Sequence, residues 1–427
     1  MAARTFATGA QGHRRRTLLP SLLIPVSVCL GGCASPPPAA QPLQFDLNTE
    51  PLYTRERGHG FEPGAPRNAA GQPSYFSVDL PEGNYRVTAT LGGAAASETT
   101  IKAGLRRLML DGVTLPAGGT QTRSFIVNVR TADIAAAPGV HAGRVLLKER
   151  EVSSEAWAWD RRLTLEINGP QPALRRVVIE PVQLPTVFLL GDSTVADQSS
   201  EPYASWGQML PALFKPTVAV ANHAESGETY RDSLARRRLD KILSTLQPGD
   251  TVLLQFGHND QKQQRDGSGS VESYQAELRT HAEAILARGG VPVVMSSMER
   301  RNFDAQGHLK PSLLDYADAA RAVAAQMKLP FIDLNAMSQQ FYAALGPERS
   351  QAAHPLNHGR LDNTHHNNYG AMQLARLVAL GLRQAQVPVA AQLRDDLGAI
   401  EPGKPQPPEH FHLAASPGFT QQRPLGD

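Results

Sequence analysis

The feature of this sequence that most constrains its fold is a series of short apolar runs, separated by longer segments with helical periodicity, that begins after Pro185. Each run is almost unbroken and rich in Val and Leu, which is typical of a strand buried on both faces. The predicted strands are Val187–Leu190, Val218–Ala221, Val252–Phe256, Val291–Met295 and Phe331–Leu334. The predicted helices are Trp206–Phe214, Ser233–Leu246, Val271–Arg288, Leu313–Met327 and Tyr369–Gln384. Strands that alternate with helices predict an α/β fold with a parallel sheet covered on both faces.

The residues before this series follow a different period. Apolar and polar side chains alternate along Tyr85–Leu91 and Leu163–Asn168, and Gly, Pro and Asn separate such runs. This pattern favours an all-β sandwich. Since 427 residues exceed one ordinary domain, we expect a β-sandwich domain over 43–183 and an α/β domain over 184–400. The tail, 401–427, is rich in Pro, Gln and His, and we expect it to be flexible.

The first 33 residues are typical of an export signal. A basic cluster at Arg14–Arg16 precedes a short apolar stretch, Leu18–Leu30, which two prolines interrupt. The closing Leu30-Gly31-Gly32-Cys33 resembles the bacterial lipoprotein cleavage box, so Cys33 is the predicted lipidation site and 34–42 a Pro/Ala-rich tether. We expect an exported protein held at the bacterial cell envelope by this lipid, at the outer membrane in a Gram-negative organism. The alternative is a secreted or periplasmic protein cut nearby.

Composition excludes several classes of function. Lys plus Arg total 42 against 40 Asp plus Glu, so no basic excess indicates a nucleic-acid partner. Both cysteines, Cys29 and Cys33, lie in the leader region, so the body has no disulfide, thiolate zinc site or cysteine nucleophile. The sequence also has no G-x-x-x-x-G-K-[ST] loop, and no G-x-G-x-x-G follows a strand. We therefore expect no nucleotide and no other cofactor.

Four polar islands lie where the α/β pattern places loops. Three follow successive predicted strands: Gly191-Asp192-Ser193-Thr194, Ser226-Gly227 and Gly257-His258-Asn259-Asp260. Because ligand sites of open α/β sheets lie beyond the carboxyl ends of the strands, these three meet at one edge of the sheet. The fourth island, Asp362-Asn363-Thr364-His365, precedes the last predicted helix.

Together the islands contain the groups that acyl transfer requires. Ser193 supplies a nucleophilic hydroxyl, His365 a base to take its proton, and Asp362 a carboxylate to orient the base. The predicted oxyanion hole comprises the backbone N–H groups of Ser193 and Gly227 and the side-chain amide of Asn259. The sequence has no G-x-S-x-G, which argues against the common α/β-hydrolase arrangement.

In order and spacing these islands resemble the four sequence blocks of SGNH (GDSL-type) hydrolases. The flanking residues resemble rhamnogalacturonan acetylesterases in four segments: Phe188–Gln198, Ser205–Leu210, Asn222–Gly227 and Gln255–Asp260. Upstream, Phe45–Leu47 and Gly58–Phe61 resemble the extra β-domain that precedes some bacterial members. The resemblance implies a three-layer, flavodoxin-like SGNH domain after a galactose-binding-like β-sandwich. It also implies cofactor-free removal of acetyl groups from galacturonic acid residues of the pectin backbone.

One residue departs from the family pattern, and several others are candidates for contacts with the substrate. Glu228 follows Ser226-Gly227, where a small or basic residue is expected. Arg300 and Arg301 lie near the predicted rim, where guanidinium groups could pair with the carboxylates of an acidic polysaccharide; a solvated loop is the alternative. Trp206 and Tyr203 are candidates for stacking on a sugar, with a core position as the alternative. His258 is a further candidate for substrate binding, and His366 is a candidate for the wall of the pocket, with an exposed position as the alternative.

Other functions remain open at this point. His354, His358, His365 and His366 form a loose cluster that could bind a metal, although a zinc site would leave Ser193 without a role and we expect none. The acyl substrate could instead be acetylated xylan or a lipid ester. A third alternative is a non-catalytic polysaccharide-binding protein. We expect a monomer whose partner is an acetylated acidic polysaccharide.

Overall fold

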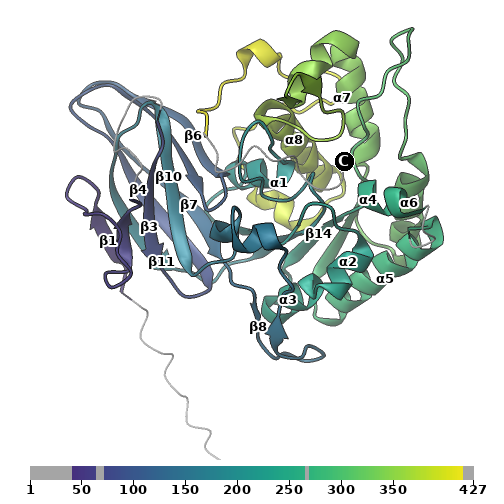
Figure 1. Ribbon diagram of the computed structural model, residues 1–427, viewed down its shortest axis with the longest axis horizontal. Coiled ribbons are helices and arrows are strands. Elements are labelled where there is room, and N and C mark those ends of the chain that lie inside the picture. The colour runs from purple at the N-terminus through teal and green to yellow at the C-terminus, as the bar shows by residue number, and fades with distance from the viewer. Residues whose placement is uncertain (1–40, 64–71, 265–268, 417–427) are drawn as a thin grey trace, which may run out of the picture. The chain divides into compact units, whose positions relative to one another are not determined.

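The computed structural model describes residues 41–63, 72–264 and 269–416 (Figure 1). The predicted signal sequence, the predicted lipidation site Cys33 and nearly all of the predicted tether lie outside the described residues. Within the described ranges, no helix combines the length and the apolar character that a membrane-spanning segment needs.

The first part of the described chain consists of antiparallel strands in two sheets. One sheet has the order β1-β11-β4-β7 and the other the order β2-β3-β10-β5-β6. The strands are β1 Leu43–Asp46, β2 His59–Phe61, β3 Ser74–Asp79, β4 Gly83–Gly92, β5 Ser97–Ala103, β6 Arg107–Leu115, β7 Thr120–Val129, β10 Arg162–Gln171 and β11 Leu174–Pro181. Val87 and Val127 from one sheet share an apolar core with Ile101 and Leu165 from the other. This is the antiparallel β-rich region that the alternating pattern predicted.

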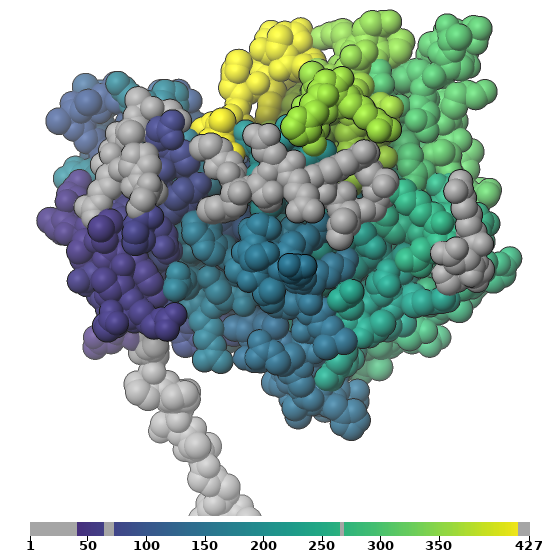
Figure 2. Space-filling view, viewed as in Figure 1, coloured from purple at the N-terminus to yellow at the C-terminus, as the bar shows by residue number. Residues whose placement is uncertain are grey.

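A long segment of the chain connects β7 with β10. The short pair β8 Asp133–Ile134 and β9 Gly143–Arg144 leads into residues 145–161, which contain the 3₁₀ helices η1 Glu149–Val152 and η2 Ala156–Ala158. We refer to residues 145–161 as the β9–β10 connection. In the space-filling view, the blue-teal atoms of residues near 150 lie between the purple first strands and the green helices (Figure 2).

The second part is built on a five-stranded parallel sheet with the order β13-β12-β14-β15-β16. Its strands are β12 Thr186–Gly191, β13 Ala219–Asn222, β14 Thr251–Gln255, β15 Val291–Met295 and β16 Phe331–Ile332. Its α-helices are α1 Trp206–Met209, α2 Tyr230–Ala235, α3 Arg238–Thr245, α4 His258–Gln263, α5 Val271–Ala287, α6 Leu314–Met327, α7 Leu334–Arg349 and α8 Asn368–Gln384. The strand order 2-1-3-4-5 is flavodoxin-like. The chain adds strands on one side of β12 and then on the other, starting with β14, and ligands of such sheets bind at this switch point between β12 and β14.

Helices cover both faces of this sheet because its strands are apolar on both sides. Along β12, Val187 and Leu189 pack with side chains of α1, α7 and α8. Phe188 and Leu190 point to the other face, where they pack with α2, α3, α5 and α6. Figure 1 accordingly shows β14 between α1 and α8 on one side and α2 and α5 on the other. The result is the predicted three-layer α/β arrangement.

Several predicted boundaries were wrong for local reasons. The helix expected over Trp206–Phe214 is α-helical only to Met209 and continues as the 3₁₀ helix Leu210–Leu213, since Pro211 has no N–H to donate. The helix expected over Ser233–Leu246 is split into α2 and α3 by Arg237, whose φ is 62°.

Two helices, α4 and α7, were missed. The first turn of α7 begins where the apolar pattern suggested a longer strand, because the Asp333 side chain accepts a hydrogen bond from Ala336 N and caps the helix.

The described part of the tail, residues 401–416, is packed against the rest of the chain. The Phe411 ring lies 5.7 Å from that of Tyr369 on α8. Further on, the Ala414 carbonyl accepts from Lys102 Nζ at 2.7 Å, and the Ser416 hydroxyl bonds to Glu166. These residues therefore differ from the flexible tail that their composition predicted, since an aromatic ring and two buried ionic groups hold them.

Candidate active site

Ser193 lies in a tight turn directly after β12, at the edge of the sheet where β12 and β14 are neighbours. The Asp192 carboxylate stabilises the turn by accepting from Thr194 N at 2.9 Å and from the Thr194 hydroxyl at 2.7 Å. The Ser193 carbonyl accepts from Gln198 Nε2 at 2.8 Å. The backbone of Ser193 is thus held on both sides, which fixes the direction of its side chain.

The structure brings Ser193, His365 and Asp362 into one chain of contacts. His365 Nε2 lies 2.8 Å from Ser193 Oγ, and His365 Nδ1 lies 2.9 Å from Asp362 Oδ2. An ionised carboxylate only accepts hydrogen bonds, so Nδ1 carries the ring proton and Nε2 is free to accept from the serine hydroxyl. All three side chains are buried. The arrangement can remove a proton from Ser193 and stabilise the imidazolium that results.

The loop that carries His365 is held by short-range contacts. Asp362 Oδ1 accepts from Thr364 N at 2.8 Å and from His365 N at 2.9 Å, which leaves Oδ2 directed at the ring of His365. This explains why the aspartate stands three residues before the histidine. The His365 carbonyl accepts from His354 Nδ1 at 2.7 Å. Burial lowers the pKa of His354 to about 4, so its ring is neutral at pH 7.

The predicted oxyanion donors Ser193, Gly227 and Asn259 follow the carboxyl ends of β12, β13 and β14, at one edge of the sheet. Gly227 has φ 77°, which favours glycine, and its N–H has no hydrogen-bond partner among the described residues. The Ser193 N–H is likewise unpaired within those residues. Asn259 lies in the first turn of α4 and donates from Nδ2 to the Glu228 carbonyl at 3.1 Å, which leaves its second amide hydrogen available. The helix is capped by Gly257, so Asn259 does not serve as its N-cap.

The loop after Ser193 is bound to the β-rich part. The Arg106 guanidinium donates to the carbonyls of Tyr203 at 2.8 Å and Gln198 at 3.1 Å. The Asp197 carboxylate lies 3.7 Å from Arg107 and 3.6 Å from Arg130. All three arginines are buried. The β-rich part therefore fixes the chain on one side of Ser193.

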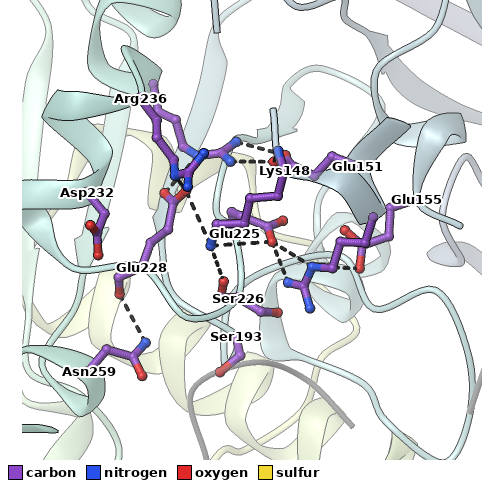
Figure 3. A network of polar contacts seen from close by, with 12 residues as sticks. Lys148, Glu151, Glu155, Ser193, Glu225, Ser226, Glu228, Asp232, Arg236 and Asn259 are labelled. Carbon is purple, nitrogen blue, oxygen red and sulfur yellow. Dashed lines mark hydrogen bonds and ion pairs between the residues drawn. The ribbon is translucent and has the colours of Figure 1, made fainter. Parts of the chain in front are cut away.

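A second set of buried charges holds the segment Glu225–Thr229, which we call the oxyanion loop. Arg150 Nε, in the β9–β10 connection, donates to Glu225 at 2.8 Å, and Arg238 Nε donates to Glu228 at 2.7 Å. Figure 3 labels the two glutamates and marks their contacts with dashed lines. Glu228 is fully buried, so the acidic residue that departs from the family pattern is the partner of a buried arginine. Nearby, burial and the neighbouring Glu225 raise the pKa of Glu155 to about 8.

Two of the candidate substrate-binding residues have structural positions instead. The Trp206 side chain is fully buried and donates from Nε1 to Gln255 Oε1 at 2.7 Å, so it presents no face to a sugar. Arg301 is 9% exposed and donates to Ser350 Oγ at 2.8 Å and to Asn363 Oδ1 at 3.1 Å. Arg301 thus supports the loop that carries His365, a position that its place after a strand did not indicate.

The remaining candidates lie closer to the site. Buried His258 places Nδ1 3.4 Å from Asp192 Oδ2, next to Ser193. Arg300 is partly exposed and donates to Gln261 Oε1 at 2.7 Å. His366 is buried, with Nε2 2.6 Å from the hydroxyl of Tyr342, while the Tyr203 ring packs edge-on against His365 at 5.9 Å. Of these, Arg300 alone has a side chain with appreciable exposure.

Of the four histidines considered for a metal, three have other hydrogen-bond partners and the fourth, His358, is exposed. His365 contacts Asp362 and Ser193, His354 a backbone carbonyl and His366 a tyrosine. Across residues 41–63, 72–264 and 269–416, no group of three or more His, Cys, Asp or Glu side chains is arranged to hold a metal ion.

Sequence reasoning missed the residues of the β9–β10 connection. The run Lys148-Glu149-Arg150-Glu151 alternates in charge, a pattern typical of a solvated surface. In the structure Glu151 is buried, and its carboxylate receives both Arg238 and the N–H of Lys148. The unexpected Glu228 was the available signal, since a buried carboxylate requires a cationic partner.

Comparisons with known proteins identify relatives of the α/β part of the chain. The sequence profile of the GDSL-like lipase/acylhydrolase family matches residues 189–372. The rhamnogalacturonan acetylesterase RhgT of Bacillus subtilis (strain 168) is 38% identical over 225 residues, which cover 50% of this chain and 95% of that protein.

Another relative extends over both parts of the chain. The uncharacterized esterase YxiM of Bacillus subtilis (strain 168) is 26% identical over 396 residues, covering 84% of this chain and 95% of that protein. Its crystal structure, at 24% identity, covers 82% of this chain and 99% of its own with a TM-score of 0.47.

Proposed function

We propose that this chain, which belongs to the GDSL-like lipase/acylhydrolase family and is a serine hydrolase of carbohydrate esters, removes O-acetyl groups from rhamnogalacturonan. The support for this substrate is the 38% identity to a rhamnogalacturonan acetylesterase over nearly the whole of that enzyme. We further propose that hydrolysis proceeds through an acyl-enzyme formed on Ser193.

In the first half of the reaction the ester acylates the serine. Ser193 Oγ attacks the acetyl carbonyl carbon while its proton moves to His365 Nε2, 2.8 Å away. The carbonyl oxygen becomes an oxyanion that accepts from the N–H groups of Ser193 and Gly227 and from the Asn259 amide. When the tetrahedral intermediate collapses, the bond from carbon to the sugar oxygen breaks. The sugar oxygen takes the proton from His365 and leaves as an alcohol.

In the second half water takes the place of the sugar. His365 removes a proton from the water, whose oxygen attacks the acetyl-Ser193 carbonyl in the same oxyanion hole. Collapse breaks the bond to Ser193 Oγ, which recovers its proton from His365, and acetate leaves. Throughout, the Asp362 carboxylate holds the ring of His365 and stabilises its positive charge.

The observation that carries the mechanism is the continuous contact from Ser193 Oγ through His365 to Asp362 Oδ2. Replacing Ser193 with Ala removes the nucleophile, so release of acetate from acetylated rhamnogalacturonan should fall to the background rate. The thermal unfolding transition should stay within a few degrees of that of the unmodified protein. Full activity in Ser193→Ala would overturn the acyl-enzyme mechanism.

The substrate is tested with a panel of acetylated polysaccharides. We expect kcat/KM for acetylated rhamnogalacturonan to exceed that for acetylated xylan by at least about tenfold, a discrimination of about 1.4 kcal/mol. Preference for xylan would refute the pectic substrate while leaving the mechanism intact. Failure to hydrolyse even p-nitrophenyl acetate would favour a protein that only binds polysaccharide.

We also propose that the protein is exported and anchored by a lipid on Cys33, on the basis of the basic cluster, the apolar stretch and the Leu30-Gly31-Gly32-Cys33 box. Cys33→Ala should move the protein from the membrane fraction to the soluble fraction. Cys29→Ala is the matched control, because Cys29 is the only other cysteine and lies outside the box. Unchanged membrane association in Cys33→Ala would refute the anchor.

A further inference from the structure

The peptide unit between Ser226 and Gly227 is held from the side opposite Ser193. Lys148 Nζ, from the β9–β10 connection, donates to the Ser226 carbonyl at 2.6 Å. In Figure 3 the ammonium reaches Ser226 from one side of the loop, and Ser193 lies beyond its other side. This contact joins residues 78 positions apart in the sequence.

The geometry of a trans peptide turns this contact into control of an oxyanion donor. The carbonyl of Ser226 and the N–H of Gly227 belong to the same planar unit and point in opposite directions. A group that fixes the direction of the carbonyl therefore fixes the direction of the N–H. The positive charge also polarises the peptide, because the effective dielectric constant of a buried site is lower than that of water, and so strengthens the N–H as a donor.

The position of Lys148 is itself determined by buried charges. Its ammonium lies between the carboxylates of Glu225 at 3.8 Å and Glu228 at 3.7 Å. Its backbone N–H donates to Glu151 Oε2 at 2.8 Å, and the same Glu151 carboxylate receives the two terminal nitrogens of Arg238 at 3.0 and 2.7 Å. Arg238 is fully buried at the start of α3. Lys148 is therefore held at its ammonium by two carboxylates and at its backbone N–H by a third.

The same network extends to the second donor of the predicted oxyanion hole. Asn259 Nδ2 is oriented by the Glu228 carbonyl, and the Glu228 carboxylate is paired with Arg238. A displacement of the oxyanion loop would thus move the Gly227 N–H and the Asn259 amide together. Displacements of about 1 Å in such groups cost about a hundredfold in rate.

We propose that Lys148 is a positioning residue for ester hydrolysis, which sets the direction of the Gly227 N–H through its bond to the Ser226 carbonyl. The β-rich part of the chain, through the connection that carries Lys148, therefore completes the oxyanion hole of the α/β part. This inference rests on the proposed acyl-enzyme mechanism at Ser193.

The test compares variants of the full-length protein with p-nitrophenyl acetate as substrate. Lys148→Met keeps the length of the side chain but removes its charge and its donor, and we expect kcat to fall about ten- to a hundredfold with KM changed less than threefold. Lys148→Arg, which restores a cationic donor, should recover most of this loss. An unchanged kcat in Lys148→Met would overturn the proposal.

Arg236→Met is the matched control for loss of charge. Arg236 lies 3.6 Å from the Glu228 carboxylate and donates to the Leu146 carbonyl, whereas the Ser226 carbonyl is bound by Lys148. Its removal takes the same charge from the network, so kcat should change less than threefold. An equal loss of kcat in Arg236→Met and Lys148→Met would mean that the network acts only through charge or stability, and would refute a specific role for Lys148.

A covalent probe separates this proposal from the proposed mechanism. A p-nitrophenyl phosphonate ester that is attacked by a serine should modify Ser193, with release of p-nitrophenol, about ten- to a hundredfold more slowly in Lys148→Met. Modification of another residue in the unmodified protein would refute the mechanism at Ser193. Modification of Ser193 at equal rates in both proteins would refute the role of Lys148 alone.

A second variant covers the case in which Lys148→Met does not fold. Lys148→Gln keeps a neutral N–H donor, and we expect kcat to fall about three- to tenfold because polarisation of the peptide is lost while its direction is partly kept. A kcat equal to that of the unmodified protein would overturn the proposal as well.

Discussion

The loop that carries His365 and the oxyanion loop both bring groups to Ser193, but different forces hold them. The former is fixed by hydrogen bonds within a few positions, such as that from the His365 N–H to the Asp362 carboxylate, together with one buried guanidinium, Arg301, that donates to Asn363. The oxyanion loop is fixed by ion pairs with residues about 75 positions earlier, such as Arg150 with Glu225. One site can thus combine a proposed base positioned largely by its own loop with proposed oxyanion donors positioned by a distant segment.

The two modes of support differ in how much stability is lost with a single contact. A backbone hydrogen bond contributes about 1 kcal/mol net, so the loop of His365 depends on several small contributions. Removal of one partner from a buried ion pair leaves an uncompensated charge and costs several kcal/mol. We therefore expect substitutions near His365 to change catalysis more than stability, and substitutions behind the oxyanion loop to change both.

The largest effect is expected from Asp362→Asn. An amide in place of the carboxylate stabilises the wrong tautomer of His365, so kcat should fall about ten-thousandfold. The urea midpoint of unfolding should change little, because the amide oxygen can still accept from the backbone N–H of His365. Loss of stability in step with activity would mean that this loop depends on charge in the same way as the oxyanion loop.

The next effect is expected from Arg238→Met, which leaves Glu151 and Glu228 without their buried partner. The free energy of unfolding should fall by about 3–5 kcal/mol, measured by urea denaturation. Arg231→Met is the control, because its pair with Glu277 is partly exposed and should contribute less than about 1 kcal/mol. Equal losses in the two variants would contradict the dependence of the oxyanion loop on buried charge.

A somewhat smaller effect is expected from Asn259→Ala. Loss of one oxyanion donor should lower kcat about a hundred- to a thousandfold, equivalent to about 2.7–4 kcal/mol, with KM nearly unchanged. The measurement is steady-state kinetics with p-nitrophenyl acetate. A loss below threefold would remove the Asn259 amide from the oxyanion hole and leave the two backbone N–H groups.

The stability of the loop that carries His365 should depend on pH in the acid range, because buried His354 donates to the His365 carbonyl. The pKa of His354 is about 4 in the folded protein and about 6.5 when unfolded, so the unfolded chain binds the proton first as pH falls. The contribution of His354 to the free energy of unfolding should therefore decrease by about 2 kcal/mol between pH 7 and pH 5. His354→Asn should flatten this part of the curve, and an unchanged slope would exclude His354 as its source.

Buried Glu155, which lies near Glu225 behind the oxyanion loop, should make stability depend on pH in the opposite direction. The pKa of Glu155 is about 8 in the folded protein and lies near 4.5 when unfolded, so the folded chain retains the proton as pH rises. Stability should fall with rising pH in this interval, by about 1 kcal/mol between pH 7 and pH 8. Glu155→Gln should remove this decrease in urea titrations, whereas an identical decrease would exclude Glu155.

The sequence predicted those features that depend on neighbouring residues. The parallel sheet follows from apolar runs such as Val187–Leu190, and the contact of His365 with Asp362 follows from their spacing of three. Contacts between distant segments could not be predicted, because an alternating run such as Lys148–Glu151 has the composition of a solvated surface. The position of Trp206 could not be predicted for the same reason. The pattern allowed its ring to face either a ligand or the core, and in the structure its Nε1 donates to Gln255.

The return of the tail to the β-rich part has a consequence for the order in which the chain assembles. Lys102 and Glu166 form a buried pair 3.8 Å apart in neighbouring strands, and the Ser416 hydroxyl bonds to both. Glu166 and Ser416 are separated by 250 positions. Although domains generally fold from the N-terminus as synthesis proceeds, this pair lacks its partner until residue 416 has left the ribosome. Strands β5 and β10, which carry Lys102 and Glu166, therefore reach their final environment only after the tail has been synthesised.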